Sequence, residues 1–105
     1  MFINEKVMVD KLYELVTGEE GFIIELRCDN HFNEKKYSDI KNILCILVLD
    51  WKSQQTISKK AMMAIIELLD CLVGGSRFFD EDQAIRVEDA SIEIKDIIND
   101  LYETI

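Results

Sequence analysis

The sequence predicts an all-α protein, a bundle of four or five antiparallel helices in up-and-down order with short connections. Three observations lead to this prediction. The 105-residue chain has no proline and only four glycines, whereas average usage would give about five prolines. Apolar residues recur with the helical period in several segments. Residues that can cap a helix precede these segments. A chain of this length is most simply one domain, spanning residues 1–105.

The first two expected helices lie close together at the start of the chain. Asn4 can cap a helix over about 4–17. Its apolar residues share one helical face and are Met8, Leu12, Leu15 and Val16. Thr17 and Glu20 fit a capping box, which predicts a second helix over about 19–30. A strand is the alternative for this segment, because FIIEL is short and compatible with β-structure.

The two middle segments are the most apolar of the chain. Ser38 can cap a helix over about 40–51, and nearly its whole circumference is apolar, so we expect it to be central. ILCILVL alone fits a buried strand equally well, and only its place among helical segments favours a helix. Ser58 caps a further helix that ends at Gly74. The polar residues 30–36 are expected to form a connection.

The last expected helix covers about 90–104 and has the most regular amphipathic pattern. Asp89 or Ser91 can cap it. Its apolar residues recur at helical spacing and are Ile94, Ile97, Ile98, Leu101 and Tyr102. The preceding stretch, residues 76–89, reads SRFFDEDQAIRVED. It is too polar for a core segment and too aromatic for an ordinary solvent loop.

The charge of the chain bounds its partners. The sequence has 21 acidic and 12 basic residues, a net charge of −9, and a hydrophobic content of 49%. Such a surface repels nucleic acid and anionic membranes, and it favours a basic partner or simply solubility. No apolar run approaches the roughly 18 residues that cross a bilayer, and the start lacks the order of a signal peptide. We therefore expect a soluble, cytoplasmic protein.

No motif for catalysis, a cofactor or a metal is found. Cys28, Cys45 and Cys71 have no CxxC spacing, and His31 is the one histidine, so a zinc site is not expected. Cys45 and Cys71 lie in apolar runs and are expected to be reduced core residues. The acids at 80–82 lack the alternating spacing of a calcium loop. These absences argue against an enzyme.

The stretch 76–89 is the candidate surface for binding a protein partner. Clustered carboxylates can steer a basic partner, and an adjacent aromatic side chain can supply a desolvated anchor. The residues predicted to bind are Phe78, Phe79, Asp80, Glu81, Asp82, Glu88 and Asp89, with Glu19 and Glu20 as lesser contacts. We expect one of the two phenylalanines to point inward and the other outward. A solvated acidic turn is the plain alternative.

Several segments of the chain resemble colicin D-type immunity proteins. They are LYELVTGE at 12–19, IELLD at 66–70, RFFDED at 77–82 and VEDASIEIKDIINDLYE at 87–103. The glycine pair at 74–75 and the segment GFIIELR depart from the usual pattern. The resemblance implies a small helical bundle that blocks a toxin nuclease, often one that cuts tRNA, by occupying its basic substrate site. Immunity proteins of contact-dependent growth-inhibition systems share this size and acidity.

A homodimeric adaptor or regulatory subunit is the second interpretation. The wide apolar stripes of 40–51 and 58–73 favour it, because one small bundle has difficulty covering both. The expected oligomeric state is thus a monomer or a weak homodimer.

Overall fold

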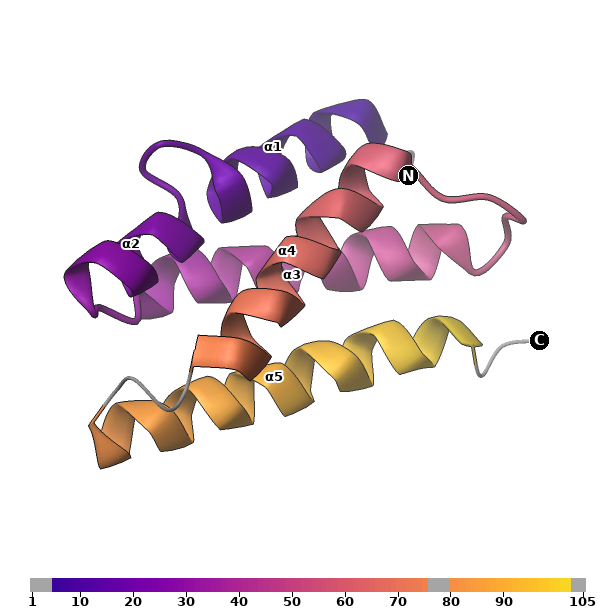
Figure 1. The fold of residues 1–105 in the computed structure, drawn as a ribbon. Helices are drawn as coiled ribbons and strands as arrows, with labels where there is room; N and C mark the ends of the chain where they lie inside the picture. Colours follow the sequence, from indigo (N-terminus) through magenta and orange to yellow (C-terminus); the bar gives the residue numbers. More distant parts are fainter. Residues whose placement is uncertain (1–4, 76–79, 103–105) are drawn as a thin grey trace.

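The computed structural model describes residues 5–75 and 80–102 and contains five α-helices (Figure 1). They are α1 Glu5–Thr17, α2 Phe22–Asp29, α3 Glu34–Trp51, α4 Lys59–Gly75 and α5 Glu81–Tyr102. The described residues include no β-strand, so the predicted all-α class is confirmed. Within these ranges no helix is both long enough and apolar enough to cross a membrane.

The four long helices enclose one core. α1 and α5 lie on opposite sides of the molecule, and each of them packs against both α3 and α4. Figure 1 shows α4 crossing in front of α3, with successive long helices running in opposite directions. The short α2 packs against α1 and α4. The largest fully buried side chains come from α1 to α5 and include Leu12, Phe22, Tyr37, Trp51, Leu68 and Ile94.

The turn between α1 and α2 differs from the predicted capping box. Thr17 Oγ1 donates a hydrogen bond back to the Tyr13 carbonyl at 2.8 Å. Gly21 is the N-cap of α2, and no side-chain hydrogen bond caps it, so the capping-box prediction is wrong. A Cβ on Gly21 would lie 2.9 Å from the Val16 carbonyl oxygen, too close for a side chain. α2 is a helix and not a strand, and it ends at Asn30, whose φ of 50° is left-handed.

α3 begins earlier than predicted, and α4 begins where predicted. Asn33 Oδ1 accepts a hydrogen bond from the Lys36 amide at 3.0 Å, so Asn33 caps α3 and Ser38 does not. Part of the expected connection is therefore helical. Ser58 Oγ accepts from the Ala61 amide at 3.2 Å, which confirms Ser58 as the cap of α4.

One face of α3 is exposed, although its sequence indicated a central helix. Leu49 is 70% exposed, Ile46 is 37% exposed, and Cys45 is exposed beside them. The prediction that Cys45 is a core residue is wrong, whereas Cys71 is buried as expected. The physical reason is that α3 packs against α1 and α5 and is crossed by α4, which leaves its outer side uncovered.

α5 begins at Glu81, well before the predicted start near residue 90. Residues 81–89 are thus helical, and the prediction that Asp89 or Ser91 caps the last helix is wrong. Val87, Ala90 and Ile94 are fully buried at helical spacing on the inner face of α5. The phenylalanines at 78 and 79 lie outside the described residues.

Candidate protein-binding surface

Asp80 fixes the start of α5. Its Oδ1 accepts a hydrogen bond from the Gln83 amide at 2.8 Å, and its carbonyl accepts from the Ala84 amide at 2.8 Å. Asp80 is therefore an N-cap, and Glu81 and Asp82 in the first turn suit the positive end of the helix dipole. The Gln83 side chain also donates to the Asn30 carbonyl at 2.7 Å, which ties this turn to the end of α2.

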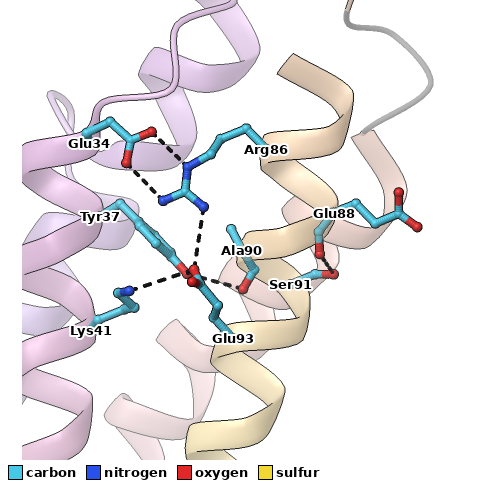
Figure 2. A network of polar contacts seen from close by, with 8 residues as sticks. All are labelled: Glu34, Tyr37, Lys41, Arg86, Glu88, Ala90, Ser91 and Glu93. Atoms are coloured by element: carbon cyan, nitrogen blue, oxygen red, sulfur yellow. Dashed lines mark hydrogen bonds and ion pairs between the residues drawn. The ribbon is translucent and has the colours of Figure 1, made fainter. Parts of the chain in front are cut away.

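A polar network holds the side of α5 that faces α3 (Figure 2). Tyr37 Oη donates to Glu93 Oε1 at 2.6 Å. Arg86 makes two hydrogen bonds to the Glu34 carboxylate, at 2.8 and 2.9 Å, and lies 3.5 Å from Glu93 Oε1. Lys41 Nζ approaches the same Glu93 oxygen at 3.7 Å. Four charged groups and one phenol thus set the rotation of α5 about its own axis.

Aromatic rings pack against the Arg86 side chain of this network. The guanidinium carbon of Arg86 lies 4.6 Å from the ring centroid of Phe32 and 4.9 Å from that of Tyr37. Phe22 packs edge-on against Phe32, with ring centroids 5.1 Å apart. Arg86 is therefore held by stacking as well as by its two carboxylates.

The network shifts the acidity of its members. Burial, followed by the hydrogen bond to Glu93, raises the pKa of the Tyr37 phenol above its usual value. The same hydrogen bond, with the charges of Lys41 and Arg86, lowers the pKa of Glu93. The hydrogen bond from Arg86 lowers the pKa of Glu34. Both carboxylates are thus stabilised as anions by contacts within the protein, although the Glu34 and Glu93 side chains stay 62% and 43% exposed.

The outer face of α5 has a different character. A seven-residue spacing places Glu81 and Glu88 in one row and Asp82, Asp89 and Asp96 in a second row. Ile85 and Ile92 lie between the rows and are 51% and 53% exposed. Seven residues span about 10 Å of helix. The surface is therefore a double line of carboxylates with an apolar centre.

These outer acids have no counter-charge among the residues that the structure describes. Among the described residues, none of the five forms an ion pair. By contrast, Glu93 and Asp100 on α5 are paired, Asp100 with Lys52 at 2.9 Å. The acids of α5 thus divide into a paired set facing α3 and an unpaired set facing outward. We name the outward residues, Glu81, Asp82, Ile85, Glu88, Asp89, Ile92 and Asp96, the α5 outer face.

The structure brings together four of the nine predicted site residues on one face of α5. Glu81, Asp82, Glu88 and Asp89 share the α5 outer face, and Asp80 caps its helix. The isoleucines Ile85 and Ile92 supply an apolar centre that the sequence interpretation missed. The missing signal was their seven-residue spacing, which has meaning only if residues 81–89 are helical.

Glu19 and Glu20 belong to a separate acidic site. They line a hollow of about 390 Å³ beside α2, and the other lining residues are Ile24, Glu25, Asp29 and Lys36. Lys36 Nζ donates to the Glu20 carbonyl and to Glu25 Oε1, the latter at 3.3 Å. A hydrogen bond from Asn33, then Lys36, lowers the pKa of Glu25. No α5 residue lines this hollow, so the described structure does not join it to the α5 outer face.

The described residues offer no site for metal chemistry. Within 5–75 and 80–102, no group of three or more His, Cys, Asp or Glu side chains could hold a metal ion. His31 is exposed and lies 3.7 Å from a Glu25 oxygen.

The fold and this surface define a class: a small acidic helical bundle with a negatively charged, partly apolar helix face. Comparison with known proteins adds no relationship to this description, because no protein family, curated protein or solved structure matches the chain.

Proposed function

We propose that the chain is an immunity protein, a bacterial cytoplasmic inhibitor without enzymatic activity that binds a basic toxin domain. The partner is a nuclease, most simply one that cuts RNA, and the α5 outer face occupies its substrate site. The observation that carries the proposal is the double row of unpaired carboxylates around Ile85 and Ile92. The sequence resemblance to colicin D-type immunity proteins supports the same class.

Electrostatics explains why such a face suits a nuclease. A site that binds the phosphates of RNA is lined with cations, and carboxylates in regular rows can take the place of phosphates. A net charge of −9 raises the rate of encounter with a basic partner and disfavours binding to nucleic acid itself. Charge alone gives little affinity at physiological salt, so the exposed isoleucines supply the desolvated contact.

Charge reversal on the α5 outer face tests the proposal. The double variant Glu88→Lys with Asp89→Lys should weaken binding to the toxin domain encoded by the neighbouring gene by about a hundredfold. Binding is measured by calorimetry at physiological salt, together with inhibition of the toxin's nuclease activity. Both side chains are exposed and free of ion pairs with described residues, so the fold should tolerate the change.

The matched control reverses two exposed acids elsewhere. Glu14→Lys with Glu67→Lys, on α1 and α4, makes the same change in net charge. This control should retain affinity within a few-fold. Equal loss in both variants would mean that only overall charge matters, and no loss in the first would rule out the α5 outer face.

A second candidate function, a homodimeric adaptor, is favoured by the exposed side of α3. Residues 42–49 carry no charge, and Ile46 and Leu49 are exposed there. Two copies could meet on this strip without bringing carboxylates together. Sedimentation at tens of micromolar (about the range where weak dimers form) decides between the functions. A strictly monomeric protein removes the adaptor, whereas a dimer that Leu49→Lys dissociates supports it.

A further inference from the structure

A hollow of about 330 Å³ lies between the end of α4 and the outer face of α5. The residues that line it are Leu72, Val73, Glu88, Ser91, Ile92 and Lys95. Val73 and Ile92 are 55% and 53% exposed, so they present apolar surface to whatever enters. The Ser91 hydroxyl already donates to the Glu88 carbonyl at 2.7 Å. The polar groups left for a ligand are therefore the Glu88 carboxylate and the Lys95 ammonium.

The hollow continues the α5 outer face. Glu88 and Ile92 belong to both, and Figure 2 shows Glu88 and Ser91 on the side of α5 away from the Tyr37 network. A partner that covers the carboxylate rows therefore also covers this hollow.

The negative charge around the hollow limits which molecules can occupy it. The adjoining carboxylates would repel a second copy of the chain presenting the same face, and they would repel an anionic membrane. The volume is at the lower end of small-molecule sites, and Glu88 and Ile92 of the charged face line the hollow. A side chain from a basic protein segment fits both the size and the charge.

Lys95 places a positive charge at one end of the negatively charged row, so the two ends of the surface differ in charge. It stands seven residues after Glu88, where the row of Glu81 and Glu88 would continue, and it is exposed without an ion pair to a described residue. A cation covered by a partner without an acceptor would oppose binding. A partner that fits this surface therefore has a cation near Glu88 and an acceptor near Lys95.

Resting on the proposed function, we infer that this hollow receives an apolar side chain of the toxin domain. The side chain packs between Val73 and Ile92. It is flanked in the toxin by a Lys or Arg that meets Glu88 and by an Asp or Glu that meets Lys95. The apolar insertion sets how long the complex lasts, and the two charges set the direction in which the toxin segment lies.

Truncation of the hollow, compared with truncation elsewhere, tests the insertion. Ile92→Ala and, separately, Val73→Ala should each weaken binding to the neighbouring gene's toxin domain by about tenfold, mainly through faster dissociation. The loss should persist at about 0.5 M salt, where charge contacts are screened. Leu49→Ala removes a similar exposed side chain from α3 and should leave affinity unchanged.

The outcomes separate the two proposals. A wild-type protein that does not bind the toxin domain refutes the proposed function and this inference with it. If the wild type binds and the Glu88 and Asp89 reversals weaken it, but both alanine variants behave like Leu49→Ala, then the hollow is not used and the proposed function stands. Half-exposed positions tolerate truncation, and urea unfolding of each variant verifies this.

Lys95 variants test the direction. Lys95→Glu should weaken binding by tenfold or more, and by more than Lys95→Met, because it sets two carboxylates against each other. Unchanged or tighter binding of Lys95→Glu would overturn the assigned direction, since it would mean that the toxin presents cations along the whole row.

Discussion

Tyr37 links the core of the protein to the position of the α5 outer face. The Tyr37 residue is 1% exposed, and its hydroxyl donates a short hydrogen bond to Glu93 across the contact between α3 and α5. Glu93 is held toward α3, whereas Glu88 and Asp89 on the preceding turn of α5 are exposed. A single buried phenol thus helps to fix which acids of α5 face solvent.

Replacing Tyr37 with Phe should lower the free energy of unfolding by about 1–2 kcal/mol, because a hydrogen bond to a charged group is lost while the ring remains. Urea unfolding measures the change. Tyr13→Phe is the control, since Tyr13 is 38% exposed and its hydroxyl makes no described hydrogen bond, and it should change stability by less than about 0.5 kcal/mol. Equal effects of both variants would show that the Glu93 contact is not stabilising.

Glu93 makes the stability of the protein depend on pH. Its pKa in the fold is lowered from the ordinary value of 4.5, so its contribution is complete above about pH 5 and is lost as pH falls through the lowered value. Glu93→Gln should therefore be less stable than wild type at pH 7, and this difference should shrink toward pH 3. Asp96→Asn, at an acid that forms no ion pair with a described residue, is the control variant. A difference for Glu93→Gln that is constant with pH would contradict the account.

At the scale of the element, α5 combines a capped start with the face that is proposed to bind a partner. Asp80 caps the helix, and the acids that follow it interact favourably with the helix dipole before they interact with any partner. Reversing the charge of Asp80 would therefore disturb the start of α5 as well as any contact with a partner. The two effects could not be told apart. For this reason Glu88 and Asp89, which have no capping role, are the residues to reverse.

Asp80→Ala should destabilise the protein by about 1 kcal/mol, whereas Asp80→Asn, which keeps a side-chain acceptor, should stay close to wild type. Faster amide exchange in the first turn of α5 should accompany the alanine change. Asp89→Ala is the matched control in mid-helix. Equal stability of Asp80→Ala and Asp89→Ala would exclude the cap.

The element scale also shows where sequence reasoning reached its limit. The helices at 5–17 and 59–75 follow clear apolar stripes, so their type and approximate ends could be predicted. The first half of α5 could not, because its inner face there includes Ala84, Val87 and Ala90, which are too small to give a strong apolar signal. Val87 and Ala90 are nevertheless buried in the contacts of α5 with α3 and α4, which only tertiary packing reveals.

At the scale of the molecule, charge is sorted by position. The basic residues Lys41, Lys52 and Arg86 pair with acids of α5 or α3, and this leaves the α5 outer face unopposed. The composition alone shows that acidic residues are in excess, and it predicts that the protein repels nucleic acid. It does not say which acids are free, because pairing depends on which helices become neighbours. The exposed side of α3 had the same cause: its apolar composition predicted burial, but none of the five described helices covers it.

The central claim is that the α5 outer face contacts a basic toxin domain, and methyl NMR tests it most directly. The isoleucine methyl spectrum is recorded while the neighbouring gene's toxin domain is added. Ile85 and Ile92 should shift as the complex forms, and Ile46 on α3 should not. A complex that forms while the Ile85 and Ile92 methyl signals stay in place would contradict the claim.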